Sequence, residues 1–397
     1  MKIAIVIKDY TLDRGGLERY GVQLSRFLAR EGCDVHILAN RCTVSSEESI
    51  TWHPIPMWKK PAWLKVMSFA RSIRRYLQNH SFDIVYSLSL TYPTDAFRIG
   101  DLLFRHWWIV RFPNPILRLG YSLVRHVYWA NTYLEKQIMA DDSPAVIIAN
   151  SHLGKKQAQS YYGVRSERVH VIHNGVDLER FNVEQARRRR DEIRSRWNIP
   201  PASPLLLFVA NDWQRKGLIT VLQAMGEMKS LDNPPHLLVA GKGKPQKYQK
   251  CIQDYNLQNR VHFAGRVSII EACYGAADLF VFPTLYDPFA NVCLEAMACG
   301  LPVITTMENG FSELIEPGRN GFILQNSADF RQLAKWLELG DDPAFWKTMG
   351  LRAAETAQDH SYQRTAKETM AVFDEIHRRK TRLNSLSLPD AYPSPLC

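Results

Sequence analysis

Short apolar runs alternate with helical patterns along this sequence, and that alternation constrains the fold more than any other feature. Residues 3–7 form an apolar run and residues 34–39 are the next strand candidate, and between them apolar side chains from Leu17 to Leu28 recur near the helical spacing. A strand, a glycine-containing loop, a helix and a second strand make a βαβ unit, in which the two strands lie parallel. We therefore expect an α/β fold built on parallel sheets.

The alternation runs through two series that a proline-rich junction separates. Residues 184–196 form a charged helical pattern, and Pro200, Pro201 and Pro204 after it break any helix. Because 397 residues are too many for one core of about 150 to 200 residues, we expect two domains with a cleft between them. The remaining strand candidates are residues 84–87, 145–149, 169–172, 205–210, 236–240, 261–264, 279–283 and 302–305.

The composition is typical of a folded, soluble protein, with 46% hydrophobic and 23% charged residues. The longest apolar runs are strand-sized and fall short of the roughly 20 residues that span a bilayer, so no transmembrane helix is expected. The N-terminus lacks the longer apolar core of a secretory signal and is interpreted as a strand. The seven cysteines show no paired spacing, which predicts reduced cytoplasmic thiols and no zinc site.

The formal net charge of +10 lies mostly in the first 180 residues and indicates an anionic partner. Residues 55–125 carry 11 basic and 3 acidic side chains, interleaved with large aromatic ones. One interpretation is a face that rests on an anionic membrane near a lipid-linked acceptor, and the other is an amphipathic core helix with snorkelling Arg and Lys. A nucleic-acid partner is not expected, because the basic residues form no recognisable binding motif.

Three loops carry residues suited to a phosphorylated ligand. Gly15 and Gly16 lie between a strand and a helix, where backbone N–H groups can approach a phosphate, although a plain tight turn would look the same. Arg215 and Lys216 follow the first strand of the second series, and ligands of open α/β sheets bind beyond the carboxyl ends of strands. An adjacent basic pair on a solvated surface is the alternative.

The third loop carries Asp287 and leads into a helix that begins near Asn291, with Glu295 one turn inside. The free N–H groups of residues 290–293 can hold a phosphate, while the carboxylates accept hydrogen bonds from sugar hydroxyls. A capping Asp and an exposed Glu would explain each residue alone. They would not explain why residues 300–302 immediately re-enter a buried strand.

The segment from Asp287 through Glu295 to Val303 resembles the Glu-x7-Glu motif of retaining GT-B glycosyltransferases of the group-1 family. The resemblance covers nearly the whole chain, because further family motifs occur in the same order. Within the family the chain is most similar to the lipopolysaccharide core glucosyltransferases, through residues 214–217 and 243–247. The ordered motifs are Gly15-Gly16, residues 173–177, residues 215–217 and residues 261–266.

The resemblance implies a GT-B architecture, in which two Rossmann-like doubly wound domains face a deep cleft. Residues 1–180 would be the acceptor-binding domain, 181–204 a linker and 205–360 the nucleotide-sugar-binding domain. Residues 361–382 would form a helix that crosses back to the first domain, before a disordered tail over 383–397.

The resemblance also implies roles for individual residues. Gly15 and Gly16 would contact the donor phosphates, and Arg215 and Lys216 would neutralise the diphosphate. Asp287, one methylene shorter than the family's Glu, would contact the donor sugar, and Asp95 in the loop 93–96 would orient the acceptor hydroxyl. The donor-binding residues would be Arg266 and Val267 at the nucleobase, Phe289, Ala290, Asn291 and Val292 at the helix start, and Glu295 at the ribose.

The implied activity is the retaining, metal-independent transfer of a hexose. The donor would be UDP-glucose, used as a co-substrate with no cofactor, and the acceptor a lipid-linked lipopolysaccharide core or related cell-surface glycan. The enzyme would be cytoplasmic and peripherally associated with the inner face of the plasma membrane. Another nucleotide sugar, a sugar-nucleotide epimerase and a catalytically silent nucleotide-sugar sensor are the alternatives.

Overall fold

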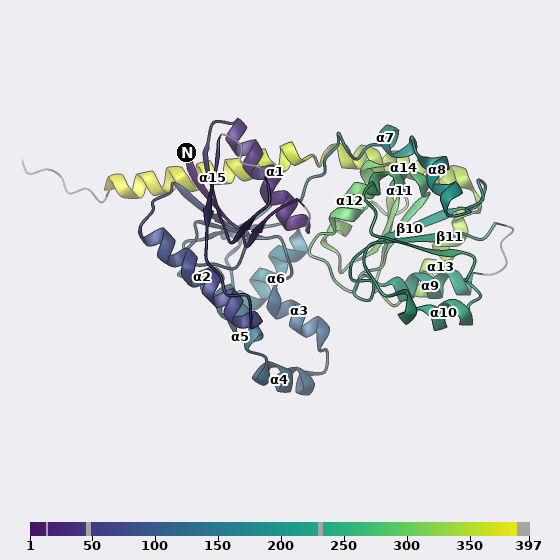
Figure 1. The fold of residues 1–397 in the computed structure, drawn as a ribbon, viewed down its shortest axis with the longest axis horizontal. Coiled ribbons are helices and arrows are strands. Elements are labelled where there is room, and N and C mark those ends of the chain that lie inside the picture. Colours follow the sequence, from purple (N-terminus) through teal and green to yellow (C-terminus); the bar gives the residue numbers. More distant parts are fainter. Residues whose placement is uncertain (13–14, 45–48, 229–232, 387–397) are drawn as a thin grey trace, which may run out of the picture. The chain divides into compact units, whose positions relative to one another are not determined.

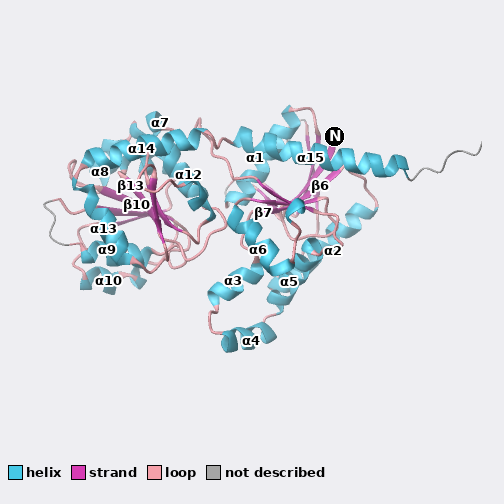
Figure 2. Ribbon diagram, turned by 180° about the vertical axis from the view of Figure 1, so that it is seen from behind, coloured by secondary structure: helices cyan, strands magenta, loops and turns pink. Residues whose placement is uncertain are grey.

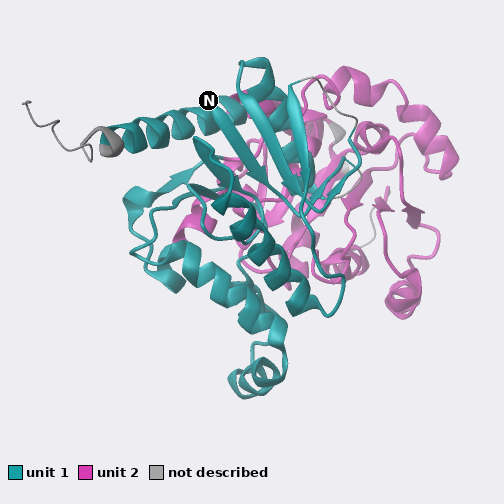
Figure 3. Cartoon of the chain, turned by 60° about the vertical axis from the view of Figure 1, so that its left-hand side comes forward, with its two compact units in different colours: residues 1–149, 158–172, 365–397 teal, residues 150–157, 173–364 magenta. Residues whose placement is uncertain are grey.

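The computed structural model describes residues 1–12, 15–44, 49–228 and 233–386. The chain forms two compact units (Figure 3). Unit 1 comprises Met1–Ala149, Ala158–Ile172 and the C-terminal part from Thr365, and unit 2 comprises Asn150–Gln157 and His173–Arg364. Two helices, α6 (His152–Tyr162) and α15 (Tyr362–Leu386), have residues in both units.

Unit 1 is built on a seven-stranded parallel sheet in the order β5-β3-β1-β6-β7-β8-β9 (Figures 1 and 2). Alternate residues of its strands enter the cores on its two faces, which explains why the strands read as continuous apolar runs. The strands are β1 (Lys2–Val6), β3 (Asp34–Ala39), β5 (Ile50–Pro54), β6 (Ile84–Ser87), β7 (Ala96–Ile99), β8 (Val146–Ala149) and β9 (Val169–Val171), and β2 (Asp9–Tyr10) pairs separately with β4 (Arg41–Cys42).

Helices cover both faces of this sheet. Ile3 and Ile5 of β1 share a core with Tyr20 of α1 and Phe373 of α15, while Ala4 and Val6 share the opposite core with Phe69 of α2. The last helix of the chain thus completes the unit that the first strand begins. The helices of unit 1 are α1 (Gly16–Arg30), α2 (Ala62–Gln78), α3 (Phe104–Arg111), α4 (Pro115–Val124) and α5 (His126–Met139), together with most of α15 and the end of α6.

Unit 2 contains a six-stranded parallel sheet in the order β12-β11-β10-β13-β14-β15. The α/β fold with parallel sheets in two domains, expected from the sequence, is confirmed. The strands are β10 (Leu205–Val209), β11 (His236–Ala240), β12 (Val261–Gly265), β13 (Leu279–Phe282), β14 (Val303–Thr306) and β15 (Gly321–Leu324). The helices are α9 (Leu218–Glu227), α10 (Gln249–Asp254), α11 (Ile270–Ala276), α12 (Asn291–Ala298), α13 (Phe330–Glu338) and α14 (Pro343–Gln358).

The segment 181–204, expected to link the domains, packs into unit 2 as helices α7 (Val183–Arg187) and α8 (Arg190–Arg196). Its apolar residues Ala186 and Ile193 lie in the core of that unit. Arg190 donates to the carbonyls of Ala276 and Ala277 at the end of α11 and pairs with Asp278 at 2.6 Å. The charged stretch is therefore fixed to unit 2 by its arginines.

The expected disordered tail, residues 383–397, begins inside α15, which continues to Leu386. Residues 387–397 lie outside the part of the chain that the structure describes.

Candidate functional site

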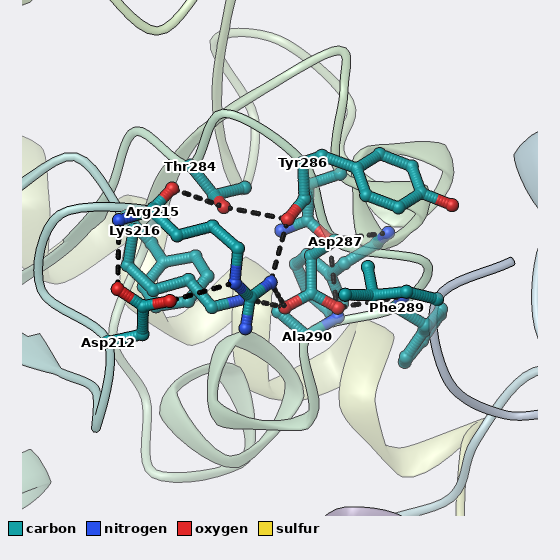
Figure 4. Close-up of polar contacts among 12 residues, drawn as sticks. Asp212, Arg215, Lys216, Thr284, Tyr286, Asp287, Phe289 and Ala290 are labelled. Atoms are coloured by element: carbon teal, nitrogen blue, oxygen red, sulfur yellow. Dashed lines mark hydrogen bonds and ion pairs between the residues drawn. The ribbon is translucent and has the colours of Figure 1, made fainter. Parts of the chain in front are cut away.

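The carboxyl ends of β10 and β13 bring two cations and one carboxylate of unit 2 together (Figure 4). Lys216, from the loop after β10, forms an ion pair with Asp287 from the loop after β13, and their side chains are only 8% and 14% exposed. The Arg215 guanidinium lies 4.0 Å from the same Asp287 oxygen and donates to the carbonyl of Tyr286 at 2.9 Å. The three predicted residues therefore form one cluster at this edge of the sheet.

The cluster shifts the titration of its lysine. Burial lowers the pKa of Lys216, Asp287 opposes that shift, and the neighbouring Arg215 charge adds to it. A buried ammonium group is costly unless a counter-ion compensates for its lost hydration. The Asp287 carboxylate is therefore what keeps a charged lysine at this position.

The loop that carries the two cations is fixed by the loop after β13. The N–H of Leu285 donates to the carbonyl of Arg215 at 2.9 Å. Gly217 has a left-handed φ of 81°, and a Cβ atom placed there would lie 2.0 Å from the carbonyl oxygen of Pro283. Only glycine permits both this conformation and this approach, so it sets the position of Lys216.

The start of α12 offers fewer free N–H groups than the sequence predicts. The N–H of Phe289 donates to Asp287 at 3.1 Å, and that of Ala290 donates to the side chain of Asn309 at 3.2 Å. Within the described parts of the chain, the N–H groups of Asn291 and Val292 donate no hydrogen bond to another protein group. Of the N–H groups of residues 290–293 that were expected to hold a phosphate, that of Ala290 thus already serves the protein, as does that of Cys293, which donates to the Ala290 carbonyl at 3.0 Å. The donor-binding roles of Phe289 and Ala290 stay predictions.

Asn309 is a functional candidate that the sequence analysis missed. Its fully buried side chain accepts from the N–H groups of Ala290 and Phe311 and donates to the hydroxyl of Thr305 at 3.0 Å. It thereby joins the loop after β14 to the residue that precedes α12. An Asn-Gly pair that follows a buried strand after two intervening residues was the available signal.

Glu295 lies one turn into α12 and accepts a hydrogen bond of 2.9 Å from the hydroxyl of Tyr274 in α11. Burial and the neighbouring Glu295 carboxylate raise the pKa of Tyr274 well above its usual range, so the phenol stays protonated and acts as a donor. This bond fixes one oxygen of the Glu295 carboxylate.

Arg266 and Val267 follow β12, at the same carboxyl edge of the sheet but beyond β11. Arg266 is exposed and Val267 is half-buried. Trp213 of the β10 loop stacks on Phe263 of β12 at 5.2 Å between ring centroids. The predicted nucleobase contacts thus lie on the edge that carries the cluster.

Gly15 and Gly16 belong to unit 1, where Gly15 is the N-cap of α1 and both residues are exposed. A cavity of about 340 Å³ lies at the carboxyl ends of β1, β6 and β7 and is lined by Lys8, Glu18, Lys65 and Asp101, among others. Burial, followed by the Lys65 charge, lowers the pKa of Lys8, and Asp101 opposes the shift. The cavity therefore holds charges of both signs.

Asp95 lies at the opposite edge, before β7, and does not line this cavity. Its carboxylate accepts from the N–H of Val85 at 2.8 Å and pairs with Lys380 of α15 at 3.0 Å. In this structure Asp95 thus holds α15 at the amino edge of the sheet, and its acceptor role stays a prediction. Asp101, which the sequence analysis missed, follows β7 and is the exposed carboxylate at the carboxyl edge.

The cluster of unit 2 suits an anionic ligand that also carries hydroxyl groups. Two cations and the N-terminus of α12 favour a phosphate group, and Glu295 can accept hydrogen bonds from hydroxyls. Within the described residues, no group of three or more His, Cys, Asp and Glu side chains could hold a metal ion.

Two family models match the chain. Residues 189–347 match the group 1 glycosyl transferases, and residues 14–180 match glycosyltransferase family 4. The two matches cover segments from both units.

Curated relatives match this chain over most of their length, as two of them show. The lipopolysaccharide glucosyltransferase WaaG of Escherichia coli is 29% identical over 80% of this chain and 84% of that protein. A D-inositol 3-phosphate glycosyltransferase of Pseudarthrobacter chlorophenolicus is 26% identical over 91% of this chain and 90% of that protein.

Two solved structures share the fold. The crystal structure of WaaG, a glycosyltransferase involved in lipopolysaccharide biosynthesis, has a TM-score of 0.81 at 20% identity and covers 94% of this chain and 99% of its own. Anabaena HepE in complex with UDP-glucose has a TM-score of 0.69 at 18% identity, with 94% and 100% covered.

Proposed function

Because the chain belongs to the group 1 glycosyltransferases and has their GT-B fold, we propose that it transfers glucose from UDP-glucose to a lipopolysaccharide core or a related cell-surface glycan. The observation that carries the proposal is the cluster of Arg215, Lys216 and Asp287 at the carboxyl ends of β10 and β13. The name of the WaaG relative and the UDP-glucose complex of HepE support the choice of sugar and acceptor.

The proposed reaction needs the departing diphosphate to be stabilised. As the bond between the anomeric carbon and the diphosphate breaks, negative charge grows on the phosphate oxygen. Arg215, Lys216 and the N–H groups of Asn291 and Val292 would stabilise that charge without a metal ion. The acceptor oxygen bonds to the face of the anomeric carbon from which the diphosphate departs, so the configuration is retained. The acceptor proton passes to the leaving phosphate oxygen.

The carboxylates would orient the donor. Both oxygens of Asp287 already accept, one from Lys216 and the other from the N–H of Phe289. An ionised carboxylate has about four acceptor sites, so a sugar hydroxyl can still be bound. Glu295, held by Tyr274, would accept from the ribose hydroxyls.

We place the acceptor in the 340 Å³ cavity of unit 1, with Asp101 instead of Asp95 near its reacting hydroxyl. An inositol phosphate acceptor is the second candidate, because the relative from Pseudarthrobacter chlorophenolicus carries that name. Two lysines that line the cavity, Lys8 and Lys65, would suit such a phosphate.

We also propose that α4 rests on an anionic membrane at the inner face of the plasma membrane. Two of the helices within the basic, aromatic residues 55–125 differ in their burial. Helix α2 buries Val66, Phe69 and Ile73, as an amphipathic core helix does. In α4, by contrast, Ile116 is 80% and Val124 is 70% exposed. No helix among the described residues is long and apolar enough to cross a membrane.

Further side chains of α4 and its flanks match a membrane surface. Apolar side chains there enter the interface while basic ones meet anionic headgroups. The exposed apolar residues are Leu117, Leu119 and Leu123, and the basic ones are Arg111, Arg118 and Arg125.

The donor is tested with purified protein and a panel of UDP-glucose, UDP-galactose and GDP-mannose, by thermal stabilisation and by UDP or GDP release. We expect UDP-glucose to stabilise most and to release UDP when a truncated lipopolysaccharide core is added. Inositol 3-phosphate is run in parallel as the second acceptor. Conversion of UDP-glucose to UDP-galactose without release of UDP would establish the epimerase alternative.

Membrane association is tested by flotation with neutral vesicles and with vesicles that contain phosphatidylglycerol. We expect flotation only with the anionic vesicles and its loss in Leu119→Asp. Leu351→Asp, at a half-exposed position on α14 of unit 2, is the matched control. Equal flotation with both lipid compositions would contradict the proposal.

A further inference from the structure

Unit 1 contains a second cavity, of about 620 Å³, which we call the aromatic cavity. Three of its rings, Tyr128, Trp129 and Tyr133, come from α5, and two, Tyr161 and Tyr162, come from the end of α6. Trp129 and Tyr133 lie one helical turn apart and are each 53% exposed. Flat aromatic surface therefore faces solvent in a concave setting of the size that small-molecule sites have.

Hydrogen bonds to the protein fix the rings from α6. Tyr162 donates to the buried carboxylate of Glu135, and the Tyr161 hydroxyl lies 2.9 Å from Nδ1 of His106. The Arg105 guanidinium donates to the carbonyl of Tyr161 at 2.7 Å and lies over both rings. The two rings from α6 are thus held in place before any ligand arrives, which lowers the entropy that binding costs.

The cavity mixes these rings with hydrogen-bonding groups of both charges. Arg105, Lys136, Asp141 and Thr132 line it beside the aromatic residues. A lipid tail would exclude water from these charged groups and offer them no hydrogen bond in exchange. A pyranose ring fits the lining better, because its C–H face packs on an aromatic ring while its rim of hydroxyls donates and accepts hydrogen bonds.

The aromatic cavity is connected to the parts of unit 1 that the proposed function uses. Glu135, which holds Tyr162, also lines the 340 Å³ cavity at the carboxyl ends of the strands. Trp129 follows α4 by less than two turns of α5, and Figures 1 and 2 show α3, α4 and α5 as neighbours. A glycan attached to a membrane lipid at α4 would meet this cavity with a sugar other than the reacting one.

We propose that the aromatic cavity binds a sugar residue of the glycan acceptor away from the hydroxyl that reacts. This inference rests on the proposed function, because it assumes a glycan acceptor. It assigns Trp129 and Tyr133 to ring stacking and Arg105 and Lys136 to hydroxyl contacts.

The test is saturation-transfer NMR on the full chain with maltotriose and with triacetylchitotriose, in the presence of saturating UDP to occupy the donor site. We expect saturation of the sugar ring protons in the wild type and a decrease of about fivefold in Trp129→Ala. Trp58→Ala, at an exposed tryptophan outside the cavity, should leave the signal unchanged. Tyr133→Ala is the second variant if Trp129→Ala does not fold.

Three results would overturn the inference. The first is that neither trisaccharide is saturated by the wild type, and the second is that Trp129→Ala saturates them as strongly as the wild type does. The third is that Trp129→Ala no longer floats with vesicles while its saccharide contact is intact. The last would assign Trp129 to the membrane surface. Saccharide contact in a protein that does not bind UDP would overturn the proposed function alone. UDP binding without saccharide contact would overturn this inference alone.

Discussion

Lys216 and Asp287 form an ion pair between the loops that follow β10 and β13. The carboxylate expected at the donor sugar is therefore the counter-ion of the lysine expected at the diphosphate. A substitution of either residue changes the charge of the other's surroundings, so the two must be tested together.

We expect Lys216→Ala to lower kcat/KM by about 10² to 10³, the effect of removing one charge-stabilising donor. Asp287→Ala should also lower it, and the double variant should lose less than the product of the two single effects, because paired residues are coupled. Initial rates of UDP release measure this, with Lys347→Ala at an exposed lysine of α14 as the control. Additive losses would show that the ion pair does not couple the two contacts.

The pH dependence of kcat/KM should reveal the buried lysine. Burial lowers the pKa of Lys216 from the ordinary lysine value of 10.5. As the pH rises, the lysine should therefore lose its charge, and the enzyme its activity, before the pH reaches 10.5. In the window between the folded and unfolded pKa values the unfolded chain binds more protons, so this group's contribution to stability rises with pH while the activity falls. Lys216→Arg should move the alkaline limb upward, and an identical limb in both proteins would assign it to another group.

Tyr274→Phe should weaken the binding of UDP without a large change in melting temperature. The variant removes the hydrogen bond that orients Glu295, worth about 0.5 to 1.5 kcal/mol or roughly a 2- to 13-fold increase in Kd. Isothermal titration with UDP measures it, and Glu295→Gln should weaken binding at least as much. Unchanged affinity in Tyr274→Phe would remove the phenol from the donor site.

Asp95→Asn should change the stability of the protein, whereas Asp101→Asn should change transfer to the acceptor. Asp95→Asn removes the counter-ion of Lys380 and should lower the free energy of unfolding by about 1 kcal/mol, with the acceptor KM unchanged. Asp101→Asn should leave stability unchanged and impair transfer to the acceptor. Urea denaturation and acceptor kinetics separate the two, and a raised acceptor KM in Asp95→Asn alone would restore the original assignment.

Gly217→Ala should be more destabilising than Gly318→Ala. Both glycines have a left-handed φ, near 81° and 82°, which costs a non-glycine residue about 1 to 2 kcal/mol. A Cβ atom at Gly217 would also meet the Pro283 carbonyl at 2.0 Å, whereas nothing lies within 4 Å of one at Gly318. Equal losses in chemical denaturation would show that the loop after β13 moves aside freely.

Most strands of the two large sheets could be predicted from their apolar residues, but β5, β7 and β15 were missed. Residues 34–39, 84–87 and 236–240 match β3, β6 and β11. β7 was missed because Arg98 interrupts it, and the structure accommodates this buried arginine with the Tyr20 ring and the carbonyl of Ile172. Without β7, Asp95 looked like the residue after one strand, when it is the residue before the next.

The candidate site was predictable where its residues follow strands directly. Arg215, Lys216 and Asp287 do so, and parallel pairing brings them together. The use of the Ala290 N–H could not be predicted, because its acceptor Asn309 comes from a different loop 19 residues later. No local sequence pattern predicts which loop's side-chain amide will accept a hydrogen bond at the start of a helix.

The membership of α15 in unit 1 has a consequence for the order of folding during synthesis. Unit 2 is built almost entirely from one continuous stretch, whereas the core of unit 1 needs Phe373 and Ile376 beside Ile3. A ribosome releases the first strand long before that helix, so the N-terminal sheet must wait with part of one apolar face uncovered until residues 365–376 have emerged. The half that starts first is thus the half that finishes last.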